Sequence, residues 1–167
     1  MLEMAGRKEM IFMSEVSVKF LAAIKVASLE KEGPREEVGK ALQQLARILE
    51  EKKVKLAGIP LGVFHDDPKS WDVQKVHYEV CFPISGRIKG EGEVKGKELG
   101  RGAFACITHS GPIEKLPDAY REILKWIEEN GWQVTGASRE VYHKGIAEAE
   151  GSLQECLIEL QFPVVAK

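Results

Sequence analysis

The stretch HSGPIEKLPDAYREILKWIEENG (109–131) decides the fold, because an earlier stretch, EKEGPREEVGKALQQLARILEEK (30–52), is a second version of it. The two are offset by 78 positions, the distance from Gly33 to Gly111. The same offset pairs Ala41 with Ala119, Leu45 with Ile123, Ile48 with Trp126, Leu49 with Ile127, Gly58 with Gly136, and Phe64-His65 with Tyr142-His143. With the offset increased by two positions, YEVCFPI (78–84) aligns with IELQFPV (158–164). This near-constant offset predicts two copies of one unit about a pseudo-two-fold axis, with a ligand cleft at the seam between them.

Composition is that of a globular protein, with 44% hydrophobic and 30% charged residues among 167. That length fits one domain, and a formal net charge of −2 offers nucleic acid no electrostatic attraction. No apolar run approaches the roughly 18 residues of a membrane span. Residues 1–14 are expected to be a loosely ordered lead-in, and they lack the apolar core and cleavage site of a signal peptide. Three widely spaced cysteines (Cys81, Cys106, Cys156) favour buried, reduced thiols in a cytoplasmic protein over disulfides or a zinc site.

Apolar periodicity in the first copy predicts strand, helix, strand, strand. Residues 16–28 alternate like a half-buried strand. Residues 35–52 form one helical apolar stripe of Val38, Leu42, Leu45, Ile48 and Leu49. The two closing strands are predicted over 54–64 and 73–84, with a turn between them.

The second copy repeats this order over residues 101–109, 116–131, 132–142 and 153–164. Between the copies, the glycine-rich stretch 85–98 is predicted to be a flexible connector or an exposed hairpin. Helices kept apart from antiparallel strands define an α+β class. We expect a single domain over 15–167, with repeats at about 16–84 and 99–165.

Strand periodicity places one glutamate near the middle of the sheet in each copy. The apolar face expected to pack under the helices holds Cys156, Ile158, Leu160 and Phe162, so Glu159 lies on the opposite face. Glu79 has the matching position in the first copy. Because an unpaired buried carboxylate is costly, an aromatic ligand with a cationic or hydrogen-bond-donating group would relieve that cost while stacking on nearby rings.

The order of these motifs resembles the GyrI-like small-molecule-binding domain, which is also the effector-binding domain of multidrug-responsive bacterial transcription regulators. The segments that carry the resemblance are 109–145 and 158–164, joined more weakly by EGP (32–34), GIPLGVFHDDP (58–68) and YEVCFPI in the first half. They span about residues 16–165. The resemblance implies a duplicated β-α-β-β unit of the SHS2 type, with sheets facing one another around a central cleft and helices packed outside.

The resemblance also implies that Glu159 sits in the cleft and meets cationic aromatic ligands. Tyr142 and its repeat mate Phe64 are the aromatic positions that carry over best, although Phe64 lacks the hydroxyl that relatives often have there. Further candidate ligand-binding residues are Glu79, Trp71, Phe104 and Tyr120. No cofactor or metal is expected, since the four histidines, His65 and His143 among them, lack HxH or HExxH spacing. Nothing resembles a helix-turn-helix, so we expect a stand-alone domain that does not bind nucleic acid directly or a membrane.

Three functions fit this pattern. The first is a binding module that senses or sequesters small hydrophobic or aromatic molecules, cationic ones among them. The second is a hydrolase, because some stand-alone members of the family resemble hydrolases of reactive cyclopropane-containing alkylating compounds; Glu159 and Tyr142 would then position or activate water. The third is a protein-interaction role such as gyrase inhibition, whose partner the sequence does not identify. We favour the binding module, because no histidine is placed by motif beside Glu159 and Phe64 removes one of two symmetric hydroxyls.

Overall fold

A computed structural model describes residues 15–88, 92–146 and 153–167, so the lead-in expected over 1–14 lies outside the described residues. Two helices, α2 (Val38–Glu51) and α3 (Leu116–Glu129), each follow a single 3-10 turn, η1 (Arg35–Glu37) and η2 (Ile113–Lys115). The strands are β1 (Ser17–Leu21), β2 (Ile24–Gly33), β3 (Lys55–Leu56), β4 (Leu61–Phe64), β5 (Val76–Ser85), β6 (Val94–Leu99), β7 (Gly102–Gly111), β8 (Trp132–Val134), β9 (Ser138–Lys144) and β10 (Cys156–Ala166). The predicted α+β class is confirmed.

The two halves of the chain contain the same elements in the same order. The series β2, η1, α2, β3, β4, β5 corresponds to β7, η2, α3, β8, β9, β10. Both helices have 14 residues and begin 78 positions apart, at Val38 and Leu116. Each follows a Gly-Pro pair, whose proline is extended and ends the preceding strand.

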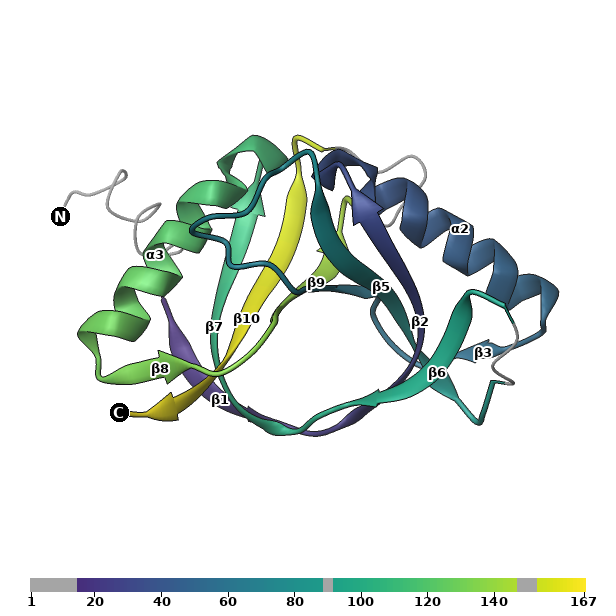
Figure 1. The fold of residues 1–167 in the computed structure, drawn as a ribbon, viewed down its shortest axis with the longest axis horizontal. Helices are drawn as coiled ribbons and strands as arrows, with labels where there is room; N and C mark the ends of the chain where they lie inside the picture. The colour runs from purple at the N-terminus through teal and green to yellow at the C-terminus, as the bar shows by residue number, and fades with distance from the viewer. Residues whose placement is uncertain (1–14, 89–91, 147–152) are drawn as a thin grey trace, which may run out of the picture.

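The strands form one antiparallel sheet that curves round into a ring (Figure 1). Neighbouring strands follow the order β1-β7-β10-β9-β4-β5-β2-β6, while β3 adds to β5 and β8 to β10. β1 continues into β2, and β6 continues into β7, so each pair forms one long strand. The two long strands pair with each other, β1 with β7 and β2 with β6, and this pairing closes the ring. A single closed sheet therefore replaces the facing sheets that the family resemblance implied.

The pseudo-two-fold axis can be located from strand register. Where β4 meets β9, Gly62 is the partner of Glu140. These two residues are also repeat mates, 78 positions apart in the sequence. The axis therefore passes between them, with a glycine on one side and a glutamate on the other.

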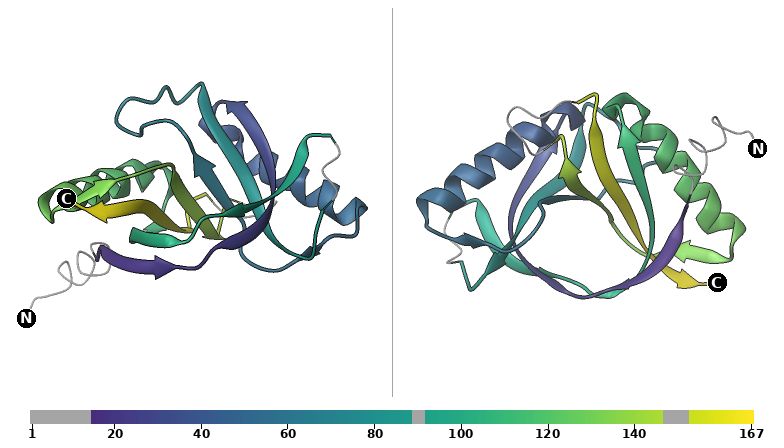
Figure 2. Two further views of the ribbon diagram at one scale, coloured as in Figure 1. Left: turned by 60° about the horizontal axis from the view of Figure 1, so that its bottom comes forward. Right: turned by 180° about the vertical axis from the view of Figure 1, so that it is seen from behind.

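Both helices lie outside the ring (Figure 2). The core between helices and sheet includes Leu42, Leu45, Ile123 and Ile127 of the helices, and a smaller core on the inner face of the ring holds Val26, Leu61, Val63, Cys81 and Leu99. All three cysteines are buried, and burial raises the pKa of the Cys81 and Cys106 thiols to about 12. No helix in the described part of the chain is long and apolar enough to cross a membrane.

The stretch 85–98, predicted to be a connector or a hairpin, contains most of an additional strand. β6 pairs with β2 from Ile24 opposite Leu99 to Leu29 opposite Val94. Only Val94 and Leu99, at its ends, are buried, and the charged or glycine residues between them are exposed. Because backbone hydrogen bonds rather than apolar side chains hold this strand, hydrophobic periodicity did not reveal it.

Candidate ligand-binding site

Two adjoining cavities lie on the helix side of the sheet, where the first turns of the two helices approach each other. The cavity beside α2 has a volume of about 510 Å³, and the cavity beside α3 about 480 Å³. Arg35, Val73, Ile113 and Glu114 line both cavities. We call the pair the cleft; it lies beside the pseudo-two-fold axis.

The segment between β4 and β5, residues 65–75, crosses in front of the sheet and reaches α3 (Figure 1). It is attached to η1 because the backbone N–H of Arg35 donates to the carbonyl of Val73 at 2.9 Å. Trp71, on this segment, packs edge-on against Phe64 at 5.9 Å and against Tyr120 at 5.4 Å between ring centroids. The row continues through Tyr78, which stacks on Phe64, and Phe162, which meets Tyr120. The cleft is therefore aromatic on the α3 side.

Glu140 is a fully buried carboxylate in the cleft, whereas Glu36 and Glu114 are exposed. Arg35 Nη2 donates to both of its oxygens at 2.7 Å, Tyr142 Oη donates at 2.8 Å, and Tyr120 Oη also donates. The Arg35 guanidinium lies over the Phe64 ring, 4.7 Å from its centroid, and 5.6 Å from that of Trp71. One buried negative charge thus receives three donors, one of them a cation that packs against two aromatic rings.

Protonation states in this cluster follow from burial and from the charge of Glu140. Burial, followed by the negative charge of Glu140, raises the pKa of Tyr120 and of Tyr142 well above the ordinary value. Burial lowers the pKa of Arg35, but its interactions, of which the attraction to Glu140 is the largest, raise the pKa by more. The pKa of Arg35 is therefore raised overall. Both phenols therefore remain hydrogen-bond donors and the guanidinium remains charged.

Each polar group of the buried cluster around Glu140 is present in only one of the two repeats. At the 78-residue offset, Arg35 matches Ile113, Tyr120 matches Leu42, Glu140 matches Gly62 and Tyr142 matches Phe64. Each polar residue of the cluster thus has an apolar mate. The duplication therefore produces a single polar site beside the axis rather than two symmetric ones.

The structure divides the predicted site residues between the two faces of the sheet. Phe64, Trp71, Tyr120 and Tyr142 come together on the helix side. Glu79, Glu159 and Phe104 lie on the inner face, and none of them lines the cleft. The expected pairing of Glu159 with Tyr142 is wrong: Tyr142 stands opposite Ile158 and Glu159 opposite Val141, and neighbouring residues of a strand point to opposite faces.

Glu79 and Glu159 each form an ion pair with a lysine, and the two ion pairs occupy matching positions in the two repeats. Glu159 accepts from Lys19 Nζ at 2.7 Å and from Gln161 at 2.6 Å. Glu79, only 5% exposed, accepts from Lys97 Nζ and Ser28 Oγ, both at 2.6 Å, and contacts His65 Nε2 at 2.7 Å. Lys19 and Lys97 are 78 positions apart, on the strands that close the ring. These carboxylates are satisfied within the described residues, and we assign them to closure of the sheet. Phe104 is likewise occupied, with the Arg139 guanidinium 4.4 Å from its centroid.

These ion pairs predict a loss of stability in acid. Burial raises the pKa of Glu79 and of Glu159, but hydrogen bonds, chiefly from Lys97 and Lys19 respectively, outweigh this, so both pKa values lie below the ordinary 4.5. The stabilisation is therefore complete above about pH 4.5 and is lost as the pH falls through the lower folded-state values. In the double variant Glu79→Gln, Glu159→Gln, we expect the free energy of unfolding at pH 7 to fall by about 1 kcal/mol for each of the two partly exposed pairs.

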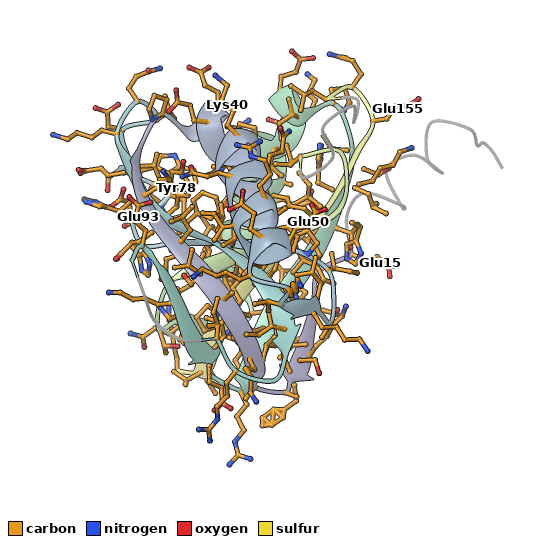
Figure 3. All side chains as sticks on the ribbon, turned by 90° about the vertical axis from the view of Figure 1, so that its right-hand side faces the viewer. Glu15, Lys40, Glu50, Tyr78, Glu93 and Glu155 are labelled. Atoms are coloured by element: carbon orange, nitrogen blue, oxygen red, sulfur yellow. The ribbon has the colours of Figure 1, made fainter. Side chains whose placement is uncertain are left out.

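The measurement is urea unfolding, followed by circular dichroism, from pH 7 to pH 3. The double variant should show a flatter fall in the free energy of unfolding below pH 4.5 than the wild type. Glu50→Gln, at the exposed end of α2 (Figure 3), is the control and should retain the wild-type slope. Equal acid slopes for wild type and double variant would contradict the assignment.

The prediction from sequence did not include Glu140 or Arg35. A signal for Glu140 was present, because Glu140 and Tyr142 are two residues apart in a strand and must share a face. Arg35 had no comparable signal: it follows the Gly-Pro turn in a run of charged residues that is typical of an exposed helix start.

Residues 14–165 match the GyrI-like small molecule binding domain, and the chain belongs to this family. Among curated proteins none matches the sequence. The crystal structure of the EcmrR C-terminal domain is similar with a TM-score of 0.81 and 23% identity, covering 92% of this chain and 98% of that one. In the cryo-EM structure of an EcmrR–DNA complex, 96% of this chain matches 61% of the EcmrR chain, with a TM-score of 0.84 and 23% identity. This chain thus spans about three-fifths of that protein.

Two more distant structures share the fold. SAV2435, solved bound to tetraphenylphosphonium, has a TM-score of 0.59 and 14% identity, covering 90% of this chain and 94% of that one. A hydrolase encoded by lin2189 from Listeria innocua has a TM-score of 0.64 and 12% identity, covering 96% of this chain and 97% of that one. At these identities the likeness concerns the fold.

Proposed function

We propose that the cleft binds small hydrophobic aromatic molecules, and that the domain senses or sequesters them. The observation that carries this proposal is an aromatic-walled cleft of two adjoining cavities around one buried, hydrogen-bonded polar cluster. A largely apolar cavity of several hundred Å³ with a few oriented polar groups is typical of small-molecule sites. At its mouth Val73 and Leu153 are exposed by 51% and 52%, apolar surface that a ligand would cover.

The family and one relative support this proposal. The family is named for small-molecule binding, and SAV2435 was solved with a bulky aromatic cation. In this chain the buried carboxylate that a cation would meet in the cleft is Glu140, because Glu159 lies on the other face of the sheet. Arg35 already pairs with both oxygens of Glu140.

The hydrolase alternative is less favoured by the geometry of the same cluster. A general base needs a carboxylate oxygen that is able to accept a proton from water. Each oxygen of Glu140 instead already accepts one hydrogen bond from Arg35 and one from a tyrosine, so neither is left for an attacking water. A likeness in fold to the Listeria hydrolase does not change this argument.

A binding experiment tests the proposed function. Isothermal titration with a panel of cationic, neutral and anionic aromatic molecules should find ligands, and Trp71→Leu should weaken them by about tenfold, because Trp71 forms one wall of the cleft. Trp132→Leu is the matched control, since Trp132 lines neither cavity. If no member of the panel binds, or if the two tryptophan variants bind alike, the cleft is not the ligand site.

A further inference from the structure

Arg35 occupies the position that a cationic ligand would need. Its Nη2 spans both oxygens of Glu140 at 2.7 Å, and its guanidinium packs on the rings of Phe64 and Trp71. Carboxylate plus aromatic rings is the arrangement that recognises an organic cation. Because Arg35 belongs to the chain, it neutralises Glu140 whether or not a ligand is present.

One donor of Arg35 lacks an acceptor. Nη1 is buried, and no described residue accepts a hydrogen bond from it. An unsatisfied buried donor destabilises the protein, and more so when it is charged. A ligand that places a carbonyl, phosphoryl or carboxylate oxygen beside Nη1 would remove this destabilisation.

The aromatic cavity has most of its charged side chains at the rim. Its lining includes three cations, Arg35, Lys69 and Arg121, against one carboxylate, Glu114. Lys69, Arg121 and Glu114 are exposed at the rim, where Asp118 also pairs with Arg121, so their charges are screened and largely balanced. Arg35 is the member whose guanidinium is packed against the aromatic wall itself.

We propose that this domain selects uncharged or anionic aromatic molecules that carry a hydrogen-bond acceptor, and that Arg35 determines the selection. The inference rests on the proposed function and specifies the ligand class of the same cleft. A cation entering the cleft meets the positive charge of Arg35 and finds Glu140 already paired. An acceptor oxygen receives the Nη1 hydrogen bond, which is charge-assisted and therefore strong.

Three probes of nearly the same shape separate these outcomes: methyltriphenylphosphonium, triphenylphosphine oxide and triphenylacetate. They carry a positive charge, a neutral acceptor and an anionic acceptor on one triphenyl body. Calorimetric titration of the wild-type protein should show the oxide and the acetate binding about tenfold or more tightly than the phosphonium. Phosphonium binding as tight as, or tighter than, that of the oxide overturns the inference.

Arg35→Met should reverse the order, because Glu140 then lacks its cation and the acceptors lose Nη1. Arg47→Met is the matched control, because Arg47 is an exposed arginine of α2 that lines neither cavity. It should retain the wild-type order. An order that does not change in Arg35→Met overturns the role of Arg35.

A second variant, Arg35→Lys, tests the role of Arg35 if Arg35→Met folds poorly. Arg35→Lys retains the positive charge but loses the planar fork. It should still reject the phosphonium, while its affinity for the oxide falls by about tenfold. Unchanged oxide affinity in Arg35→Lys would count against the Nη1 contact. If the wild type binds none of the three probes and none of the wider aromatic panel, the proposed function fails and the ligand class inferred for it fails too. If other panel members bind without the expected charge order, only the inferred ligand class is overturned.

Discussion

Replacing Glu140 with glutamine is expected to lower the free energy of unfolding by about 3 kcal/mol, because it leaves the Arg35 guanidinium packed on Phe64 without its counter-charge. Glutamine retains the size of the side chain and one acceptor oxygen, but its NH2 group faces the Arg35 donor, so the loss combines the charge with a hydrogen bond. Urea unfolding at pH 7, followed by circular dichroism, measures it. The effect is large because the Glu140 side chain is fully buried and water cannot replace the lost partner.

A double-mutant cycle shows whether the loss belongs to the ion pair. Arg35→Met should cost less than Glu140→Gln, because Tyr120 and Tyr142 still donate to the carboxylate. The double variant should be more stable than the sum of the single losses predicts, with a coupling energy of about 2 kcal/mol. Glu36→Gln, an exposed carboxylate on the rim of the same cleft, should change stability by no more than about 0.5 kcal/mol. Additive losses in the cycle would mean that the pair contributes nothing beyond its parts.

The architecture was predictable because the duplication repeats local signals. Two Gly-Pro turns, each followed by an amphipathic helix, gave both helices nearly in full. Alternation in the last strand of each copy correctly predicted which face meets the helices: Ile158, Leu160 and Phe162 are in the core beneath them. Such signals depend on residues close in the chain, and the fold confirms them.

The site was harder to predict because the sheet closes on itself. Closure depends on pairing between β1 and β7 and between β2 and β6, contacts between residues far apart in sequence. It buries Glu79 on the face expected to hold the ligand, where Lys97 already pairs with it. A strand pattern gives the face of Glu159 but not what covers that face. The carboxylate that meets the aromatic cluster comes instead from the middle strand pair, beside the axis.

Gly62 shows how little room that strand pair leaves, and Gly62→Ala is expected to destabilise the protein by about 1–3 kcal/mol. A Cβ at this position would lie 2.8 Å from Tyr142 Oη and 2.9 Å from Phe64 Cε2. Both rings are buried, so they cannot move into solvent. We expect Tyr142 to be displaced from Glu140, which weakens ligand binding as well as folding.

Gly100→Ala is the matched control for Gly62→Ala. Gly100 lies between β6 and β7, and an added Cβ there would meet nothing within 4 Å. Its φ is not positive, so alanine is expected to change stability by no more than about 0.5 kcal/mol. Thermal and urea unfolding of both variants, with titration of whichever triphenyl probe binds the wild type, make the comparison. Equal stability of the two would mean that the strand pair accommodates a methyl group, and the repeat mate of Glu140 would then not need to be glycine. A loss of stability confined to Gly62→Ala, together with weaker probe binding, would show that Tyr142 reaches Glu140 because the repeat mate of Glu140, Gly62, has no side chain.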